Sequence, residues 1–141
     1  MIAQIVMSMK IEHYRFTLPM SVRDYEVDYQ GIVNNAIYLR YLEHTRHEFC
    51  RSEGLTFEQM HNKGIDPVLA RVEMDYKTPL RMGDTFISCL NIERIGPRFI
   101  FKQDLYKTDG EPVLKALITV VCIENGRLTK GDILAESFKI Y

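Results

Sequence analysis

A carboxylate, a glycine and two asparagines stand close together in this chain, in an order that could support chemistry on a carbonyl group. Asp28 is followed by Gly31, and Asn34 and Asn35 precede a run with helical spacing. Glycine lets the backbone turn without a Cβ clash, and asparagine is a favoured helix N-cap. The free N–H groups of that helix could then polarise a carbonyl lying beside Asp28. This spacing indicates a small acyl-transfer site.

Two elements must position these residues, one on each side of Asp28. The residues from 13 to 27 are rich in Tyr, Phe, Thr and Val, which predicts a long strand, bent near Pro19, with Asp28 at its end. From Asn35 to Ser52 apolar residues recur at helical spacing between charged ones, which predicts one long helix. Gly54 is its stop signal.

The rest of the chain has the signals of strands joined by tight turns. Asp109-Gly110 and Asn125-Gly126 are strong turn pairs. The short connections predict an antiparallel meander, with the helix covering one face of the sheet. A short turn is expected over 56–62 and a short helix over 133–138. The four predicted strands are Pro67 to Thr78, Thr85 to Arg94, Arg98 to Lys107 and Pro112 to Glu124.

Composition limits the class of protein. The 141 residues fit one domain, 1–141, and the apolar fraction of 46% can supply its core. A formal charge of -1 gives no electrostatic case for nucleic acid or for an anionic membrane surface. Three widely spaced cysteines are expected to be reduced, buried thiols. With no signal-peptide pattern and no apolar run long enough for a membrane span, a cytoplasmic protein is expected.

A longer stretch carries a family resemblance. The chain resembles the hotdog-fold acyl-thioesterases of the 4-hydroxybenzoyl-CoA thioesterase type in one motif and in the elements that follow it. The motif is Val22-Arg23-Asp24-Tyr25-Glu26-Val27-Asp28 with Gly31-Ile32-Val33-Asn34-Asn35-Ala36, and a long helix and four antiparallel strands follow. The local match is closest to the branch that includes the plant acyl-lipid (acyl-carrier-protein) thioesterases. The resemblance runs roughly from residue 16 to 138 and implies an α+β hotdog fold, in which an antiparallel five-stranded sheet wraps around one long central helix.

The resemblance also implies a reaction, the hydrolysis of acyl thioesters of coenzyme A or acyl carrier protein (ACP), without metal or other cofactor. It makes Asp28 the catalytic carboxylate, as nucleophile or general base, and the Asn35 N–H the donor to the carbonyl oxygen. The chemistry agrees, because a carboxylate is ionised at neutral pH and a thioester chiefly needs an oriented attacker and an oxyanion donor. The residues expected to contact the substrate are Tyr25, Gly31, Val33, Asn34, Tyr38 and Arg98.

Two further expectations concern partners. The anionic end of the carrier could meet a basic residue, and the candidates besides Arg98 are Arg71, Lys77, Arg81, Arg94 and Lys102. One helix is too little to cover about five strands, and the segment from 113 to 123 is almost wholly apolar, as in a strand buried on both faces or lying at an interface. A homodimer or homotetramer is therefore expected.

Several alternatives accompany this interpretation. Asp28 could simply be a solvated turn residue or an Asx cap over Gly31. A related branch uses a tyrosine-histidine pair where this chain has Asn34 and Asn35, so histidine assistance at that position is unsupported. Glu43 and Glu48 are better explained as solvated helix residues than as catalytic groups. The competing function is a hotdog protein that binds an acyl thioester or an acyl carrier without turnover, and a dehydratase is a weaker third.

Overall fold

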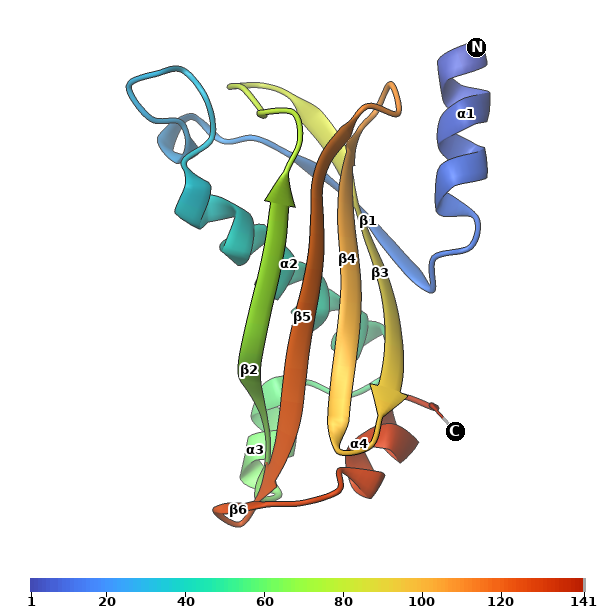
Figure 1. Ribbon diagram of the computed structural model, residues 1–141, viewed down its shortest axis with the longest axis vertical. Helices are drawn as coiled ribbons and strands as arrows, with labels where there is room; N and C mark the ends of the chain where they lie inside the picture. Colours follow the sequence, from blue (N-terminus) through green and yellow to red (C-terminus); the bar gives the residue numbers. More distant parts are fainter. Residues whose placement is uncertain (141) are drawn as a thin grey trace.

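The centre of the molecule is an antiparallel sheet crossed by one long helix, shown in Figure 1 as a computed structural model that describes residues 1–140. The strand order is β1-β3-β4-β5-β2, so only β3, β4 and β5 form a meander, while β1 and β2 occupy the two edges. The five expected strands are present, and a two-residue β6 (Arg127–Leu128), which was not predicted, pairs antiparallel with the end of β5 as a sixth strand of the sheet. The five strands are β1 (Phe16–Ser21), β2 (Ile65–Tyr76), β3 (Thr85–Ile95), β4 (Arg98–Lys107) and β5 (Pro112–Glu124).

The first strand is shorter than the sequence indicated. β1 ends at Ser21, and a 3-10 turn, η1 (Asp24–Glu26), follows it, so the prediction that Asp28 ends a long strand is wrong. Pro19 is tolerated in β1 because an edge strand has one set of N–H groups that needs no strand partner. The residues after Ser21 instead form the turn and loop that lead into the long helix.

The long helix, α2 (Asn35–Ser52), has the predicted bounds. Its buried side lies over β1 and β3 and includes Tyr41, Leu42 and Phe49. The Oγ1 of Thr45 lies 2.6 Å from the Oγ of Ser88 on β3, a buried contact that joins the helix to the sheet. The helix ends before Gly54, whose φ of +82° is the left-handed conformation of a helix stop.

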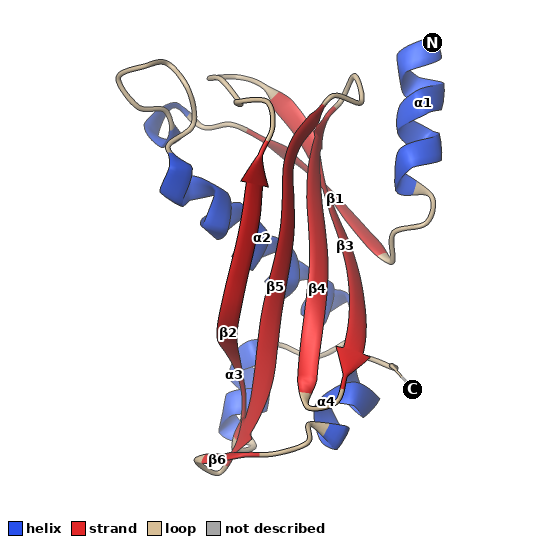
Figure 2. Cartoon of the chain, viewed as in Figure 1, coloured by secondary structure: helices blue, strands red, loops and turns tan. Residues whose placement is uncertain are grey.

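Shorter helices complete the described part of the fold and are drawn in blue in Figure 2. α4 (Asp132–Ser137) agrees with the predicted helix, α3 (Phe57–Asn62) stands where a short turn was expected, and α1 (Ile2–Ile11) was not predicted. α1 packs through Met7 against Cys89 and Tyr106. Since Ser88 faces α2, its neighbour Cys89 faces the opposite side of the sheet. α1 therefore covers part of the outer face.

Of the two explanations for the apolar β5, burial on both faces does not hold in the single chain, and a place at a subunit interface stays a prediction. Ala116, Ile118 and Val120 are buried on the side of the core, but Lys115 and Leu117 on the other face are exposed. The three cysteines are free and buried, as predicted. Among the described residues, no helix is both long and apolar enough to cross a membrane.

Candidate active site

The segment that the sequence singled out forms a short loop before α2. A β-bridge between Val27 and Val33 closes its base. Inside the loop the Asp28 N–H donates to the Ile32 carbonyl at 2.9 Å, and the Gly31 N–H donates to the Asp28 carbonyl at 3.0 Å. Gly31 has a φ of +80°, and a Cβ added there would meet no atom within 4 Å, so glycine is needed here for conformation rather than for room.

The Asp28 carboxylate has one engaged oxygen and one free oxygen. Its Oδ1 accepts the Gln30 N–H at 2.8 Å, which makes Asp28 the first residue of an Asx turn. Its Oδ2 has no hydrogen-bond partner among residues 1–140, and the residue as a whole is half-buried. Holding one oxygen fixes the direction of the other, so the turn is compatible with a chemical role.

The start of α2 leaves one backbone donor available. The Val33 N–H donates to the Leu80 carbonyl at 2.8 Å, and the Asn34 N–H donates to the Glu26 carbonyl at 3.0 Å. Asn34 caps the helix, because its Oδ1 accepts the Ala36 N–H at 2.9 Å. The Asn35 N–H has no acceptor within the described part of the chain. It stands at the positive end of the helix dipole, where it could hold an oxyanion.

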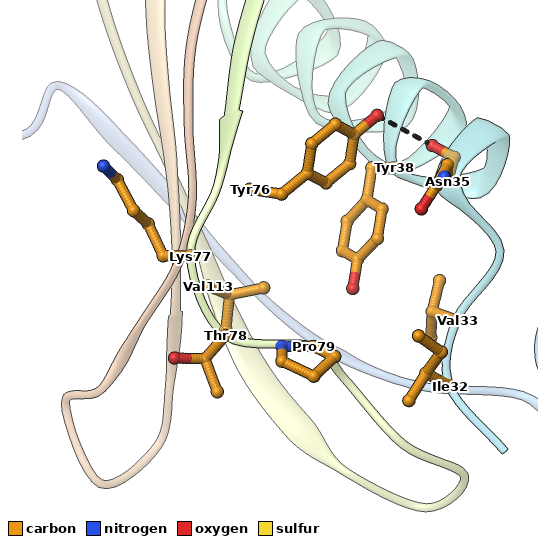
Figure 3. A pocket seen from close by; sticks show the side chains of 9 residues that line it. All are labelled: Ile32, Val33, Asn35, Tyr38, Tyr76, Lys77, Thr78, Pro79 and Val113. Atoms are coloured by element: carbon orange, nitrogen blue, oxygen red, sulfur yellow. Dashed lines mark hydrogen bonds between the residues drawn. The ribbon is translucent and has the colours of Figure 1, made fainter. Parts of the chain in front are cut away.

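A cavity of about 130 Å³ has Asn35 in its lining and lies between the start of α2 and the end of β2. Figure 3 shows the side chains around it and the hydrogen bond that the Tyr76 hydroxyl donates to the Asn35 carbonyl, at 3.3 Å. Tyr38 and Tyr76 meet edge to face, with ring centroids 5.5 Å apart. The lining residues are Ile32, Val33, Asn35, Tyr38, Tyr76, Lys77, Thr78, Pro79 and Val113.

Tyr38 provides a buried phenol at this cavity. Its oxygen accepts the Leu80 N–H at 3.1 Å, so its own proton remains available for donation. Burial raises the pKa of Tyr38, and the hydrogen bond from the Leu80 backbone opposes that rise in part. The phenol therefore stays neutral at physiological pH.

Glu26 is the structural residue that the sequence did not identify. It is buried, with 5% of its surface exposed, whereas Tyr25 is 78% exposed. The Glu26 Oε1 accepts the Arg23 N–H at 2.7 Å and the Tyr41 hydroxyl at 2.9 Å. Burial raises the pKa of Tyr41, and the bond to Glu26 raises it further. Glu26 thus ties η1 to α2, and the alternation of residue types alone could not say whether it or Tyr25 faces inwards.

The predicted substrate contacts are only partly brought together. Val33, Asn35 and Tyr38 line the cavity, while Asp28, Gly31 and Asn34 belong to the adjoining loop and cap. Tyr25 lines a different hollow, on the side of Arg40 and His44.

The candidate cations are also divided. Arg98 pairs with Val121, whereas the cavity uses Val113, eight residues away along β5 and therefore roughly 27 Å distant. Of the remaining candidates, Lys77 contributes to the lining, although its side chain extends away from Tyr38 in Figure 3. Arg81 forms a β-bridge with Ile32.

Comparison with known proteins identifies the family of the chain. The family model described as the thioesterase-like superfamily matches residues 22–136. The chain belongs to the thioesterase-like superfamily. The match begins after β1, so α1 and β1 lie outside it.

Two relatives of this thioesterase-like chain carry functional names. One is acyl-acyl carrier protein thioesterase ATL3, chloroplastic, from Arabidopsis thaliana, which is 35% identical over 108 residues, or 75% of this chain and 57% of that protein. The other is long-chain acyl-CoA thioesterase FadM from Escherichia coli, which is 30% identical over 107 residues, or 74% and 80% of the two chains. The chain thus spans little more than half the length of the plant protein.

Solved structures confirm the α+β hotdog fold. A hypothetical protein from Aquifex aeolicus superposes with a TM-score of 0.81 at 33% identity, covering 87% of this chain and 98% of its own. A 1,4-dihydroxy-2-naphthoyl-CoA thioesterase from Synechocystis superposes with a TM-score of 0.80 at 19% identity, over 87% and 93% of the two chains. The second likeness concerns the fold alone.

Proposed function

We propose that this thioesterase-like chain hydrolyses acyl thioesters of coenzyme A or ACP to a carboxylic acid and a thiol. The observation that carries the proposal is the free Asn35 N–H at the start of α2, next to a loop that holds one oxygen of Asp28 and leaves the other free. The names of the plant and Escherichia coli relatives support the same reaction class.

In the proposed reaction the thioester carbonyl oxygen accepts the Asn35 N–H, which stabilises the negative charge that develops there. Asp28 then acts in one of two ways. Its Oδ2 removes a proton from a water molecule that attacks the carbonyl carbon, or it attacks the carbon itself to form a mixed anhydride that water later hydrolyses. In both routes the C–S bond breaks and the thiolate leaves. A neutral Tyr38 phenol is available as a further donor on the cavity side.

The proposed site uses the cavity next to Asn35 for the reacting end of the substrate. The carrier's anionic end would lie outside this cavity. Of the candidate cations, Lys77 lines the cavity and Arg81 forms a β-bridge with the lining residue Ile32, so these two are the nearest. Tyr25 and Arg98 are left out of the site within one chain, because neither reaches this cavity.

Assembly into a homodimer or homotetramer is part of the proposal. β2 is a twelve-residue edge strand, and it exposes 43% of Val68 and 48% of Leu69. An edge of this length with apolar side chains is a ready template for pairing with another chain. We expect Val68→Lys to shift the molar mass measured by light scattering towards that of one chain, and an unchanged mass would exclude this edge as the interface.

A non-catalytic acyl-thioester binder remains the second candidate, because the Asx turn gives Asp28 a purely structural task. Thiol release from short, medium, long and aromatic acyl-CoAs, and from matching acyl-ACPs, separates the two. Release that is fast in the wild type and lost in Asp28→Asn supports hydrolysis. Saturable binding by calorimetry with no thiol release from any of these thioesters supports the binder.

A further inference from the structure

A second cavity, of about 280 Å³, lies farther along α2 and contains a buried arginine. Only 8% of the Arg46 surface is exposed. The walls around it are mostly apolar and come from α2, α3, three strands and the C-terminal segment. The lining residues are Glu43, Arg46, His47, Phe57, Pro67, Leu69, Phe101, Val120 and Phe138.

The Arg46 guanidinium has an incomplete set of partners. It offers five N–H donors, and the structure gives one of them an acceptor, the Gln103 Oε1, at 3.0 Å. No carboxylate oxygen of the described residues lies within 4.0 Å of its nitrogens. Burial lowers the pKa of Arg46, while the charge of Glu43 opposes that effect from a distance. A buried cation without an anionic partner is costly, so an anion is the expected complement.

The neighbouring groups hold Arg46 in place without neutralising it. Gln103 is fully buried, and its Nε2 donates to the Leu42 carbonyl at 3.0 Å, which directs its Oε1 towards Arg46. Glu43 lies at the mouth with 62% of its side chain exposed, and its Oε1 is 3.9 Å from the His47 Nε2. Burial lowers the pKa of His47, so His47 adds no charge of its own at neutral pH.

The second cavity lies on the same side of α2 as the first. Every second residue of β2 faces α2, and these residues include Tyr76, Met74 and Val72. A register shift between Leu69 and Arg71 reverses the alternation, so that Leu69 also faces α2. Arg46 is eleven residues beyond Asn35 on α2, which is about 16 Å at 1.5 Å per residue. The two linings share no residue, so an aliphatic chain held at Asn35 reaches Arg46 along β2 only when the side chains packed between them, Val72 and Met74, move aside.

We propose that Arg46 binds a carboxylate carried at the end of an aliphatic chain, with the chain in contact with Phe57, Phe101 and Phe138. Two sources have this chemistry. One is the free fatty acid that hydrolysis releases, and the other is the distal carboxylate of a dicarboxylic acyl group whose thioester lies at Asn35. The second source names a substrate class and so rests on the proposed function, whereas the binding site itself does not.

Calorimetric titration tests the site without any turnover. The probes are lauric acid and dodecanedioic acid, with dodecanol as the uncharged analogue. We expect both acids to bind the wild type more tightly than dodecanol does, and Arg46→Met to weaken the acids by about 10- to 100-fold, as for the loss of a hydrogen bond between charged groups. Arg51→Met is the matched control, because Arg51 is an exposed arginine of the same helix, paired with Glu48.

Arg46→Met removes the cost of burying an unpaired charge, but it leaves the buried Gln103 Oε1 without its donor, at about 1–3 kcal/mol, so urea unfolding of each variant accompanies the titration. Arg46→Lys keeps the charge but loses the planar fork, so it should bind the acids between the wild type and Arg46→Met. Equal binding of the acids by the wild type and both Arg46 variants would overturn the inference. The inference would also be overturned if dodecanol bound as tightly as lauric acid. It would be overturned as well if Arg46→Met changed the oligomeric state and left the binding of both acids unchanged.

Kinetics then separate the two sources. If the distal carboxylate is the ligand, Arg46→Met lowers kcat/KM for the mono-CoA thioester of dodecanedioic acid by a larger factor than it changes kcat/KM for lauroyl-CoA. If the free acid is the ligand, the variant weakens only product inhibition by lauric acid. Should the wild type release no thiol from any thioester, the proposed function fails, while the titration still decides the Arg46 site.

Discussion

Asp28→Asn separates the chemical role of this residue from its role in the turn. The Gln30 N–H donates to Oδ1 alone, and an asparagine Oδ1 can accept the same bond. The substitution therefore keeps the loop and removes the negative charge on Oδ2. We expect the free energy of unfolding to change by less than about 0.5 kcal/mol, while kcat/KM falls by about 100- to 10,000-fold, the range for a lost general base.

The assay is thiol release from a good acyl-CoA substrate, run beside urea unfolding of each variant. Asp28→Ala removes the turn bond as well, so it should lose about 0.5–1.5 kcal/mol of stability with a loss of activity similar to that of Asp28→Asn. Asp24→Asn, an exposed carboxylate of the neighbouring 3-10 turn, should stay within about twofold of the wild type. A folded Asp28→Asn that is as active as the wild type would refute the reasoning.

Three other measurements test the surrounding structure. Glu26→Ala should lower the unfolding free energy by about 1–3 kcal/mol, because it leaves buried donors without an acceptor, and Tyr41→Phe should lower it less; urea unfolding compares them. Gly31→Ala should cost about 1–2 kcal/mol through its left-handed φ alone, measured by the same method, whereas an unchanged stability would mean that the loop rearranges. Burial raises the pKa of Cys50 and Cys89 from 9.0 to about 12. The folded state thus favours the protonated thiols, so the free energy of unfolding should fall as pH rises from about 9 towards 12. Thiol reagents should label both cysteines at pH 8 only after unfolding.

The sequence predicted best those elements whose signals are local. α2 and the strands β3, β4 and β5 were found within a residue or two, because helical spacing, alternation and Gly-containing turns are written into short windows. β1 was predicted too long, since Tyr25 and Val27 have strand preferences that the turn after Ser21 overrides. The position of β2 beside β5 depends on pairing between distant residues, which no short window contains.

Residues of the candidate site were predictable where their role is local and not where it depends on contacts between distant elements. Asp28, Gly31 and Asn34 could be assigned from spacing because they act within one loop and one helix cap. Tyr76 joins them only because the end of β2 meets the start of α2. Glu26 and Arg46 look like ordinary surface charges in the sequence, and only packing shows that they are buried. Their partners, Tyr41 and Gln103, lie on other elements.

The strand order of the sheet also indicates the order in which its parts form during folding. β3, β4 and β5 are joined by tight turns, so their hairpins close short loops and should form early. The edge strands β1 and β2 close long loops when they pair, since Phe16 pairs with Leu90 and Ile65 pairs with Glu124. The cavity beside Asn35 is bounded by the loop after β1 and by the end of β2, the two edge strands. A chain trapped with only its central hairpins would therefore have a sheet but no site, so recovery of function should be among the last events of refolding.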